Sequence, residues 1–260
     1  MQLDGGVVRF SADGELEARL GSRFSDGTFA KSRLKTRRRR EPLLRTAAAL
    51  KTGNLSMLAW GDSITECGAH WHGGASKTEN NWVHVLARDL EVQHGLKVHE
   101  IADGVGGQNV AESLSRDPAS RAARDINPDL ILIELGTNDQ VYHLETPNQF
   151  AGSLRKMLTQ LIVATDSDIV LITPGPLPKS IVLTKDPPET YLRIMRDVGS
   201  EFNVPVVDMT NGINRFLTAH NQEFAQLHLG PENCHPNDAG HTAWAGVVLA
   251  GIEKYLPGVD

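Results

Sequence analysis

The chain has 260 residues, of which 40% are hydrophobic and 22% are charged. This balance is typical of a globular protein and excludes a collagen-like, coiled-coil or disordered chain. The longest apolar runs are as long as a strand and far shorter than the roughly 20 residues that span a bilayer, which excludes a transmembrane protein. No basic stretch followed by an apolar one opens the chain, so we expect a cytoplasmic location, or a secreted protein only if a leader was removed.

Charge is unevenly distributed along the chain. Residues 31–51 hold nine Lys or Arg and one acid, a charge of +8, so that a net charge of −6 leaves −14 on the rest. One interpretation is a surface for an anionic polymer such as nucleic acid. The other, which we favour, is an arm that neutralises the acidic body of its own or a neighbouring subunit. We therefore expect neither a nucleic-acid partner nor a membrane, and we expect the arm either to hold a homo-oligomer together or to clamp onto its own domain.

The N-terminal segment has a pattern different from the rest. Two stretches of strand character, 7–10 and 15–20, flank the turn sequence Ser-Ala-Asp-Gly, which predicts a β-hairpin. An isolated hairpin is marginal in water and should pack on something. We therefore expect residues 1–52 to form a hairpin and basic arm, and residues 53–260 to form the main domain.

From residue 55 onward, short apolar runs alternate with helical patterns. Strands are predicted at 57–60, 97–101, 130–135, 168–173 and 204–207. Helices are predicted at 80–94, 148–164, 188–202 and 237–255. This alternation predicts an α/β protein with a five-stranded parallel sheet between two layers of helices. Ligands of such folds bind beyond the carboxyl ends of the strands.

Three of these strand ends carry polar and glycine-rich sequences, which should meet at one edge of the sheet. They are Gly-Asp-Ser-Ile-Thr-Glu at 61–66, Asp-Gly-Val-Gly-Gly-Gln-Asn at 103–109 and Gly-Thr-Asn-Asp at 136–139. A fourth sequence, Glu-Asn-Cys-His-Pro-Asn at 232–237, places a histidine before the last helix. Each alone has a bland explanation as turn glycines, a capping serine, an asparagine turn or a loop histidine.

Together the four sequences resemble those of the SGNH (GDSL) hydrolase superfamily, from about residue 55 to residue 255. The resemblance implies the flavodoxin-like fold of that superfamily and an esterase or lipase activity without a cofactor. It implies that Ser63 is the nucleophile and His235 the general base. The oxyanion hole would consist of the Ser63 N–H, the Gly107 N–H and the Asn138 side-chain amide. Glu232 would orient the histidine, in a position that is usually aspartate in the superfamily.

The chemistry explains why these residue types are needed. A serine hydroxyl is a weak nucleophile until a base within hydrogen-bond reach takes its proton. A histidine is suited to accept that proton near neutral pH and to return it to the leaving alcohol. The tetrahedral oxyanion then requires preorganised donors, each typically worth about 3–4 kcal/mol when it is deleted.

Signatures of other enzyme classes are missing. The chain contains no Gly-x-Ser-x-Gly, no complete dinucleotide-binding fingerprint, no phosphate-binding Walker loop and no His-Glu-x-x-His. His70 and His72, with Cys67 nearby, suggest a metal site only weakly, and a pocket rim is the better interpretation. We predict no metal. The two cysteines, Cys67 and Cys234, should lie on the same side of the pocket and remain reduced in a cytoplasmic protein.

The substrate is predicted from the loops around the nucleophile. Asp62, Trp71 and Tyr142 are candidates for binding it, and the five prolines of residues 174–188 would stiffen a pocket wall. This mixture suits a short acyl group, such as acetyl, on a polar alcohol such as a sugar. The alternatives are a lysophospholipase or thioesterase of the same superfamily, and a ligand-binding module without catalytic activity.

Overall fold

The computed structural model describes residues 42–66, 80–142, 145–182 and 186–257, together with three strands near the N-terminus: β1 (Val7–Phe10), β2 (Glu15–Arg19) and β3 (Arg37–Arg38). β1 and β2 are antiparallel, with Val7 opposite Arg19 and Phe10 opposite Leu16. The predicted hairpin is therefore confirmed. β3 adds a third antiparallel strand, beside β2.

The central sheet has five parallel strands: β4 (Asn54–Gly61), β5 (Lys97–Gly104), β6 (Leu130–Glu134), β7 (Asp168–Ile172) and β8 (Val206–Val207). Their order in the sheet is β5-β4-β6-β7-β8. This is the flavodoxin-like order of a doubly wound sheet. All five predicted strands are present, and the predicted fold class is confirmed.

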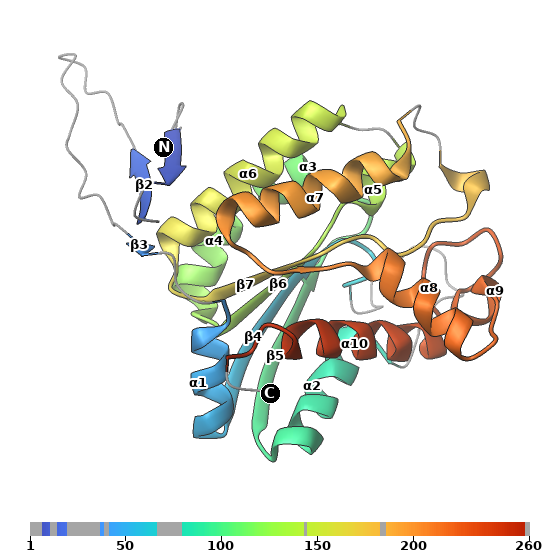
Figure 1. The fold of residues 1–260 in the computed structure, drawn as a ribbon, viewed down its shortest axis with the longest axis horizontal. Coiled ribbons are helices and arrows are strands. Elements are labelled where there is room, and N and C mark those ends of the chain that lie inside the picture. Colours follow the sequence, from blue (N-terminus) through green and yellow to red (C-terminus); the bar gives the residue numbers. More distant parts are fainter. Residues whose placement is uncertain are drawn as a thin grey trace.

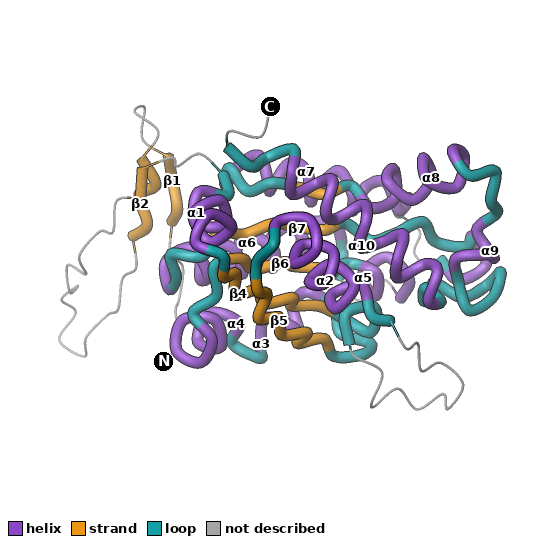
Figure 2. Tube along the Cα trace, turned by 90° about the horizontal axis from the view of Figure 1, so that it is seen from below, coloured by secondary structure: helices purple, strands orange, loops and turns teal. Residues whose placement is uncertain are grey.

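Helices cover both faces of the sheet (Figure 1). One face carries α1 (Leu44–Thr52), α2 (Trp82–His94), α8 (Met209–Ala219) and α10 (Asp238–Glu253). The other carries α3 (Val110–Ser115), α6 (Pro147–Ala164) and α7 (Pro188–Phe202). α2 and α10 lie side by side on their face (Figures 1 and 2). In the described part of the chain, no helix combines the length and the apolar character that crossing a membrane would require.

The strand β6 shows why the sheet is buried on both sides. Leu130 and Leu132 belong to the core under α2 and α10, whereas Ile131 and Ile133 belong to the core under α6 and α7. Successive side chains of a strand point to opposite faces, so a continuous apolar run is what two covering layers require. Glu134 is the exception, since this acid ends the strand with no exposed surface.

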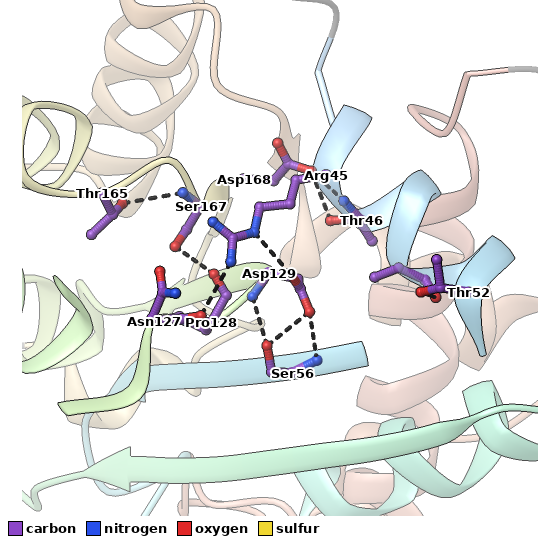
Figure 3. A network of polar contacts seen from close by, with 11 residues as sticks. Arg45, Thr46, Thr52, Ser56, Asn127, Pro128, Asp129, Thr165, Ser167 and Asp168 are labelled. Carbon is purple, nitrogen blue, oxygen red and sulfur yellow. Dashed lines mark hydrogen bonds and ion pairs between the residues drawn. The ribbon is translucent and has the colours of Figure 1, made fainter. Parts of the chain in front are cut away.

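The amino ends of the strands are joined by a polar network (Figure 3). Asp129 Oδ2 accepts hydrogen bonds from the Ser56 N–H at 2.9 Å and from Ser56 Oγ at 2.8 Å, while Asp129 Oδ1 accepts one from Arg45 Nε at 2.8 Å. Asp168 Oδ2 accepts from both the N–H and the hydroxyl of Thr46, at 2.6 and 2.9 Å. Arg45 and Thr46 lie on α1, so this helix is fastened to the sheet. The expected division of the chain after residue 52 stays a prediction, but α1, on the arm's side of it, packs with the main domain.

The last helix fixes the loop that precedes it. Asn237 caps α10, with its Oδ1 accepting from the Gly240 N–H at 2.9 Å, and its Nδ2 donates to the carbonyls of Gln226 and His228. A Cβ on Gly240 would lie 1.9 Å from the Leu227 carbonyl oxygen, so only glycine permits this approach. The loop that holds residues 232–235 is therefore anchored at its C-terminal end.

Candidate active site

The three polar sequences lie side by side, since β5, β4 and β6 are neighbours in the sheet. Two glycines allow their strand ends to approach closely. A Cβ on Gly61 would lie 2.2 Å from Thr65 Oγ1, and one on Gly104 would lie 2.3 Å from the Glu66 nitrogen. The turn after β4 is thus pressed between the ends of β5 and β6, and this places Ser63 at the carboxyl edge.

The turn around Ser63 is held by Asp62. The Asp62 carbonyl accepts hydrogen bonds from the N–H groups of Thr65 and Glu66, and Asp62 Oδ1 accepts from the Ile64 N–H at 3.0 Å. Ser63 itself is half-buried, and its Oγ lies 2.8 Å from Nε2 of His235, although 172 residues separate them in the sequence. At this distance an imidazole can accept the proton of a hydroxyl as that hydroxyl attacks a carbonyl carbon.

Three hydrogen-bond donors lie at the sequences expected to form the oxyanion hole. Within the described ranges, neither the Ser63 N–H nor the Gly107 N–H has a hydrogen-bond acceptor. Gly107 has a φ of 78°, a left-handed conformation that favours glycine. Asn138 Nδ2 donates to the Gln108 carbonyl at 2.9 Å and contacts Asp62 Oδ2 at a long 3.4 Å. Both hydrogens of this amide thus have an acceptor, and the longer contact, to Asp62, is the one that an oxyanion would replace.

The histidine is held by a residue that the sequence did not predict. Asn233 Oδ1 lies 2.8 Å from His235 Nδ1 and 2.9 Å from the His235 backbone nitrogen. Glu232, which was expected in this role, has an exposed side chain with no hydrogen bond or ion pair to any residue the structure describes. In the structure, therefore, the side chain that contacts the ring is Asn233 and not Glu232. Burial lowers the pKa of His235.

Carboxyl groups are buried beneath the site. Asp62, Glu134 and Asp139 have no exposed surface. Burial raises the pKa of Asp62 to about 6 and that of Asp139 to about 8. Burial and the neighbouring Asp62 raise the pKa of Glu134 well above its ordinary value, while Thr65 Oγ1 donates to Glu134 Oε2 at 2.9 Å. The charge of Asp62 adds to the effect of burial at Glu134, because two neighbouring buried carboxyl groups cannot both lose their protons easily.

The three residues predicted to bind substrate have different outcomes. The prediction for Asp62 is wrong, because a fully buried carboxyl that holds the nucleophile turn cannot touch a substrate. Tyr142 is the last residue of α5 (Thr137–Tyr142), three residues after the asparagine sequence, and is 55% exposed. Trp71 lies outside the described residues, and so do His70, His72 and Cys67.

No group of metal-ligating side chains occurs within the part of the chain that the structure describes. Cys234 is a free thiol. Burial and the nearby Asp62 raise the pKa of this thiol to about 12, so it is neutral at physiological pH. A neutral thiol is a poor nucleophile, so Cys234 is not expected to attack in place of Ser63.

Residues 59–243, most of the chain, match the family model of GDSL-like lipases and acylhydrolases. The chain belongs to this family. Membership makes it a hydrolase of acyl esters by class and confirms the predicted resemblance. No curated protein matches the sequence of this GDSL-like hydrolase.

Solved structures share the fold of this GDSL-like hydrolase. An acetylxylan esterase from Geobacillus stearothermophilus, Axe2, has 23% identity and a TM-score of 0.58, over 76% of this chain and 94% of its own. The acetyl xylan esterase AlAXEase has 19% identity and a TM-score of 0.61, over 76% of this chain and all of its own. LAE5, an α/β hydrolase from the metagenome of Lake Arreo in Spain, has 23% identity and a TM-score of 0.60, over 78% and 97%.

Sequence reasoning missed two residues of this GDSL-like hydrolase. Glu134 carried a signal, since it is the one acid in the apolar run of residues 130–135. Asn233 carried none that separates it from Glu232, because both precede His235 in the same short loop.

Proposed function

We propose that this chain is a serine esterase that hydrolyses short acyl esters, chiefly acetyl esters of carbohydrates, through an acyl-enzyme on Ser63. One observation carries the proposal: Ser63 Oγ lies 2.8 Å from His235 Nε2 at the carboxyl edge of the sheet. In this geometry the histidine can take the hydroxyl proton as the oxygen attacks.

The first half of the reaction forms the acyl-enzyme. Ser63 Oγ bonds to the carbonyl carbon of the ester, and its proton passes to His235 Nε2. The carbonyl oxygen becomes an oxyanion, which takes hydrogen bonds from the N–H groups of Ser63 and Gly107 and from Asn138 Nδ2. When the tetrahedral intermediate collapses, the bond to the alcohol oxygen breaks, and His235 returns its proton to that oxygen.

The second half regenerates the serine. A water molecule gives a proton to His235 and bonds to the acyl carbon, which forms a second oxyanion at the same donors. The bond to Ser63 Oγ then breaks, the serine oxygen recovers the proton from His235, and the carboxylic acid leaves. No step requires a metal or a cofactor.

Two observations support a short acyl group on a sugar. The fold neighbours include two enzymes described as acetylxylan esterases. The loop after β7 contains the five prolines of residues 174–188, which stiffen it, and it is packed against the asparagine sequence, where a Cβ on Gly136 would lie 3.2 Å from the Pro174 ring. A stiff loop that begins beside the asparagine sequence favours a small acyl group over a long chain.

The test is a series of nitrophenyl esters of increasing chain length, followed by acetylated xylo-oligosaccharides. We expect acetyl and butyryl esters to have the highest kcat/KM, and acetate to be released from the saccharides. A kcat/KM that rises steadily to long chains would overturn the substrate assignment in favour of a lipase or lysophospholipase. No hydrolysis of any ester would favour a ligand-binding module.

The nucleophile is tested by Ser63→Ala. Because only this hydroxyl can form the acyl-enzyme, we expect kcat to fall at least about 10³-fold with the fold unchanged. A phosphonate that reacts with activated serines should label the wild type at Ser63 and leave the variant unlabelled. Ser200→Ala, which changes an exposed serine on α7, is the matched control and should keep full activity. Activity above a few per cent in purified Ser63→Ala would show that another residue attacks.

A further inference from the structure

We infer that Asn233 is the positioning residue of His235, so that a neutral amide stands where serine hydrolases usually have a carboxylate. This inference rests on the proposed function, and it concerns the residue that orients the general base. It departs from the acidic residue that the sequence pattern led us to expect.

Two contacts of one oxygen fix the tautomer of the histidine. Asn233 Oδ1 is within 2.9 Å of the His235 backbone nitrogen and within 2.8 Å of its Nδ1. The backbone N–H can only donate, so the side-chain atom that faces it must be the amide oxygen. That oxygen can only accept, so Nδ1 must carry a hydrogen. In the neutral ring Nε2 is then unprotonated, and its lone pair faces Ser63 Oγ at 2.8 Å.

The other groups near the ring add no carboxylate partner at Nδ1 among the described residues. Cys234 Sγ lies 3.9 Å from Nδ1, but its thiol is neutral. His228 follows α9 (Phe224–Leu227) and His241 lies on α10; burial lowers the pKa of each to about 4, so both are uncharged near neutral pH.

Three acids surround this part of the site. The charges of Asp62, after β4, and Glu134, at the end of β6, help to raise the pKa of the Cys234 thiol. The charge of Asp238, on α10, opposes the lowering of the pKa of His241. The pKa of His235 is lowered by burial, and none of these three acids contributes to that change. The neutral amide of Asn233 at Nδ1 adds no charge that would oppose the effect of burial. His235 should therefore stay an unprotonated base at a lower pH than a histidine bound by a carboxylate would.

The kinetic test replaces each candidate in turn. Asn233→Ala should lower kcat by about 30-fold or more with KM within twofold, because the ring loses its tautomer and orientation. Asn233→Asp keeps the acceptor and adds a charge, so the pKa on the acid side of the kcat/KM profile should rise by about one unit. Glu232→Gln should change kcat by less than twofold and leave the profile in place. Asn214→Ala, at an exposed position of α8, is the matched control for loss of an asparagine.

A second measurement reads the ring without turnover. Nitrogen-15 NMR of histidine-labelled protein, recorded on Ser63→Ala and on its double variants, reports which ring nitrogen of His235 is protonated. We expect the Nδ1–H form with Asn233 present, a mixture in Asn233→Ala, and no change in Glu232→Gln. If Asn233→Ala does not fold, the pKa shift of Asn233→Asp decides.

The two proposals fail in different ways. If the wild type hydrolyses no ester, the proposed esterase is refuted. If Ser63→Ala then still shows the Nδ1–H form of His235, and the double variant with Asn233→Ala does not, the positioning role of Asn233 stands. A loss of activity and of the Nδ1–H form in Glu232→Gln, with Asn233→Asp keeping the wild-type pH profile, would assign the role to Glu232 and overturn the inference.

Discussion

The carboxyl groups at the two ends of the sheet have different surroundings. At the amino ends of the strands, Asp129 is bound by Ser56 and by the guanidinium of Arg45. At the carboxyl ends, Asp62, Glu134 and Asp139 are buried and form no ion pair with any lysine or arginine that the structure describes. Burial alone would raise the pKa of Asp129, but the hydrogen bonds from Arg45 and Ser56 outweigh it and hold that pKa below its ordinary value. At the carboxyl ends burial wins, and the pKa values of Asp62, Glu134 and Asp139 are raised.

This difference in pKa shifts indicates that the carboxyl groups at one end contribute to stability and those at the other end support the candidate site. A carboxylate whose hydrogen bonds are complete lowers the free energy of the folded state, as at Asp129. Carboxyl groups buried without a cation raise it, and such costs persist where a function requires the arrangement. Here the arrangement holds the Ser63 turn and Asn138. We therefore expect changes at the two ends to affect different measurements.

The largest effect on stability is expected for Asp129→Ala. It removes the acceptor of the Ser56 N–H, the Ser56 hydroxyl and Arg45, so the free energy of unfolding should fall by about 3 kcal/mol. Urea unfolding measures this change. Nitrophenyl acetate hydrolysis by the folded variant should stay within twofold of wild type, because the site lies at the other end of the strands. A loss of activity in a natively folded variant would break the comparison.

A smaller loss of stability, with a loss of activity, is expected for Gly104→Ala. The added Cβ would lie 2.3 Å from the Glu66 nitrogen and 2.5 Å from the Asp62 carbonyl oxygen, both backbone atoms that cannot easily move. Overpacking of this kind costs about 2 kcal/mol. The displaced Ser63 turn should lower kcat/KM at least about tenfold.

Gly152→Ala is the control for that substitution. Gly152 lies within α6, and a Cβ there would meet nothing within 4 Å. Alanine should therefore raise the free energy of unfolding by about 0.5–1 kcal/mol and leave kcat unchanged. Equal losses in both variants would contradict the tight packing at the end of β5.

The last expected effect is a change in how stability depends on pH. Between its ordinary value of 3.8 and its folded value of about 8, Asp139 holds a proton in the folded protein but not in the unfolded chain. The free energy of unfolding should therefore fall with rising pH, by about 1.4 kcal/mol per unit for one such group. Asp139→Asn should make the fall between pH 5 and pH 8 shallower by about 1 kcal/mol per unit, as measured by urea unfolding.

Asp129→Asn is the matched variant at the other end. The pKa of Asp129 is lowered, so its contribution to stability is present above the ordinary value of 3.8 and disappears as pH falls through the folded value. This variant should lose stability equally at pH 5 and pH 8, without a change in slope. A changed slope there, or an unchanged slope in Asp139→Asn, would remove the electrostatic distinction between the two ends.

The sequence was sufficient to predict the architecture, because hydrophobic periodicity can be recognised without knowing which residues are in contact. The run at residues 130–135 and its alternation with helical patterns predict a buried parallel strand. Three strand-end sequences and the histidine sequence before the last helix predict where the site lies. Some helices were not predicted. The signal for α8 was present, since Asp208 caps it and its buried residues Met209, Gly212, Ile213 and Leu217 have helical spacing.

The details of the site depend on side-chain direction, which spacing does not determine. Glu232 and Asn233 are adjacent, and only the path of the loop decides that Asn233 faces His235. Likewise, the sequence places Asp62 beside Ser63, but burial by the neighbouring strand ends, and not position in the motif, makes it a structural residue.

The wide separation of Ser63 and His235 along the chain also has a consequence for synthesis. A ribosome that adds about 5–20 residues per second needs roughly 10–30 s to travel the 172 residues between them. Throughout that interval the serine of the nascent protein has no base, and α10, whose Trp244 and Val248 complete one face of the core, has not yet been made. On the proposed mechanism a growing chain therefore cannot hydrolyse esters, and activity would begin only when the last helix has packed against the sheet.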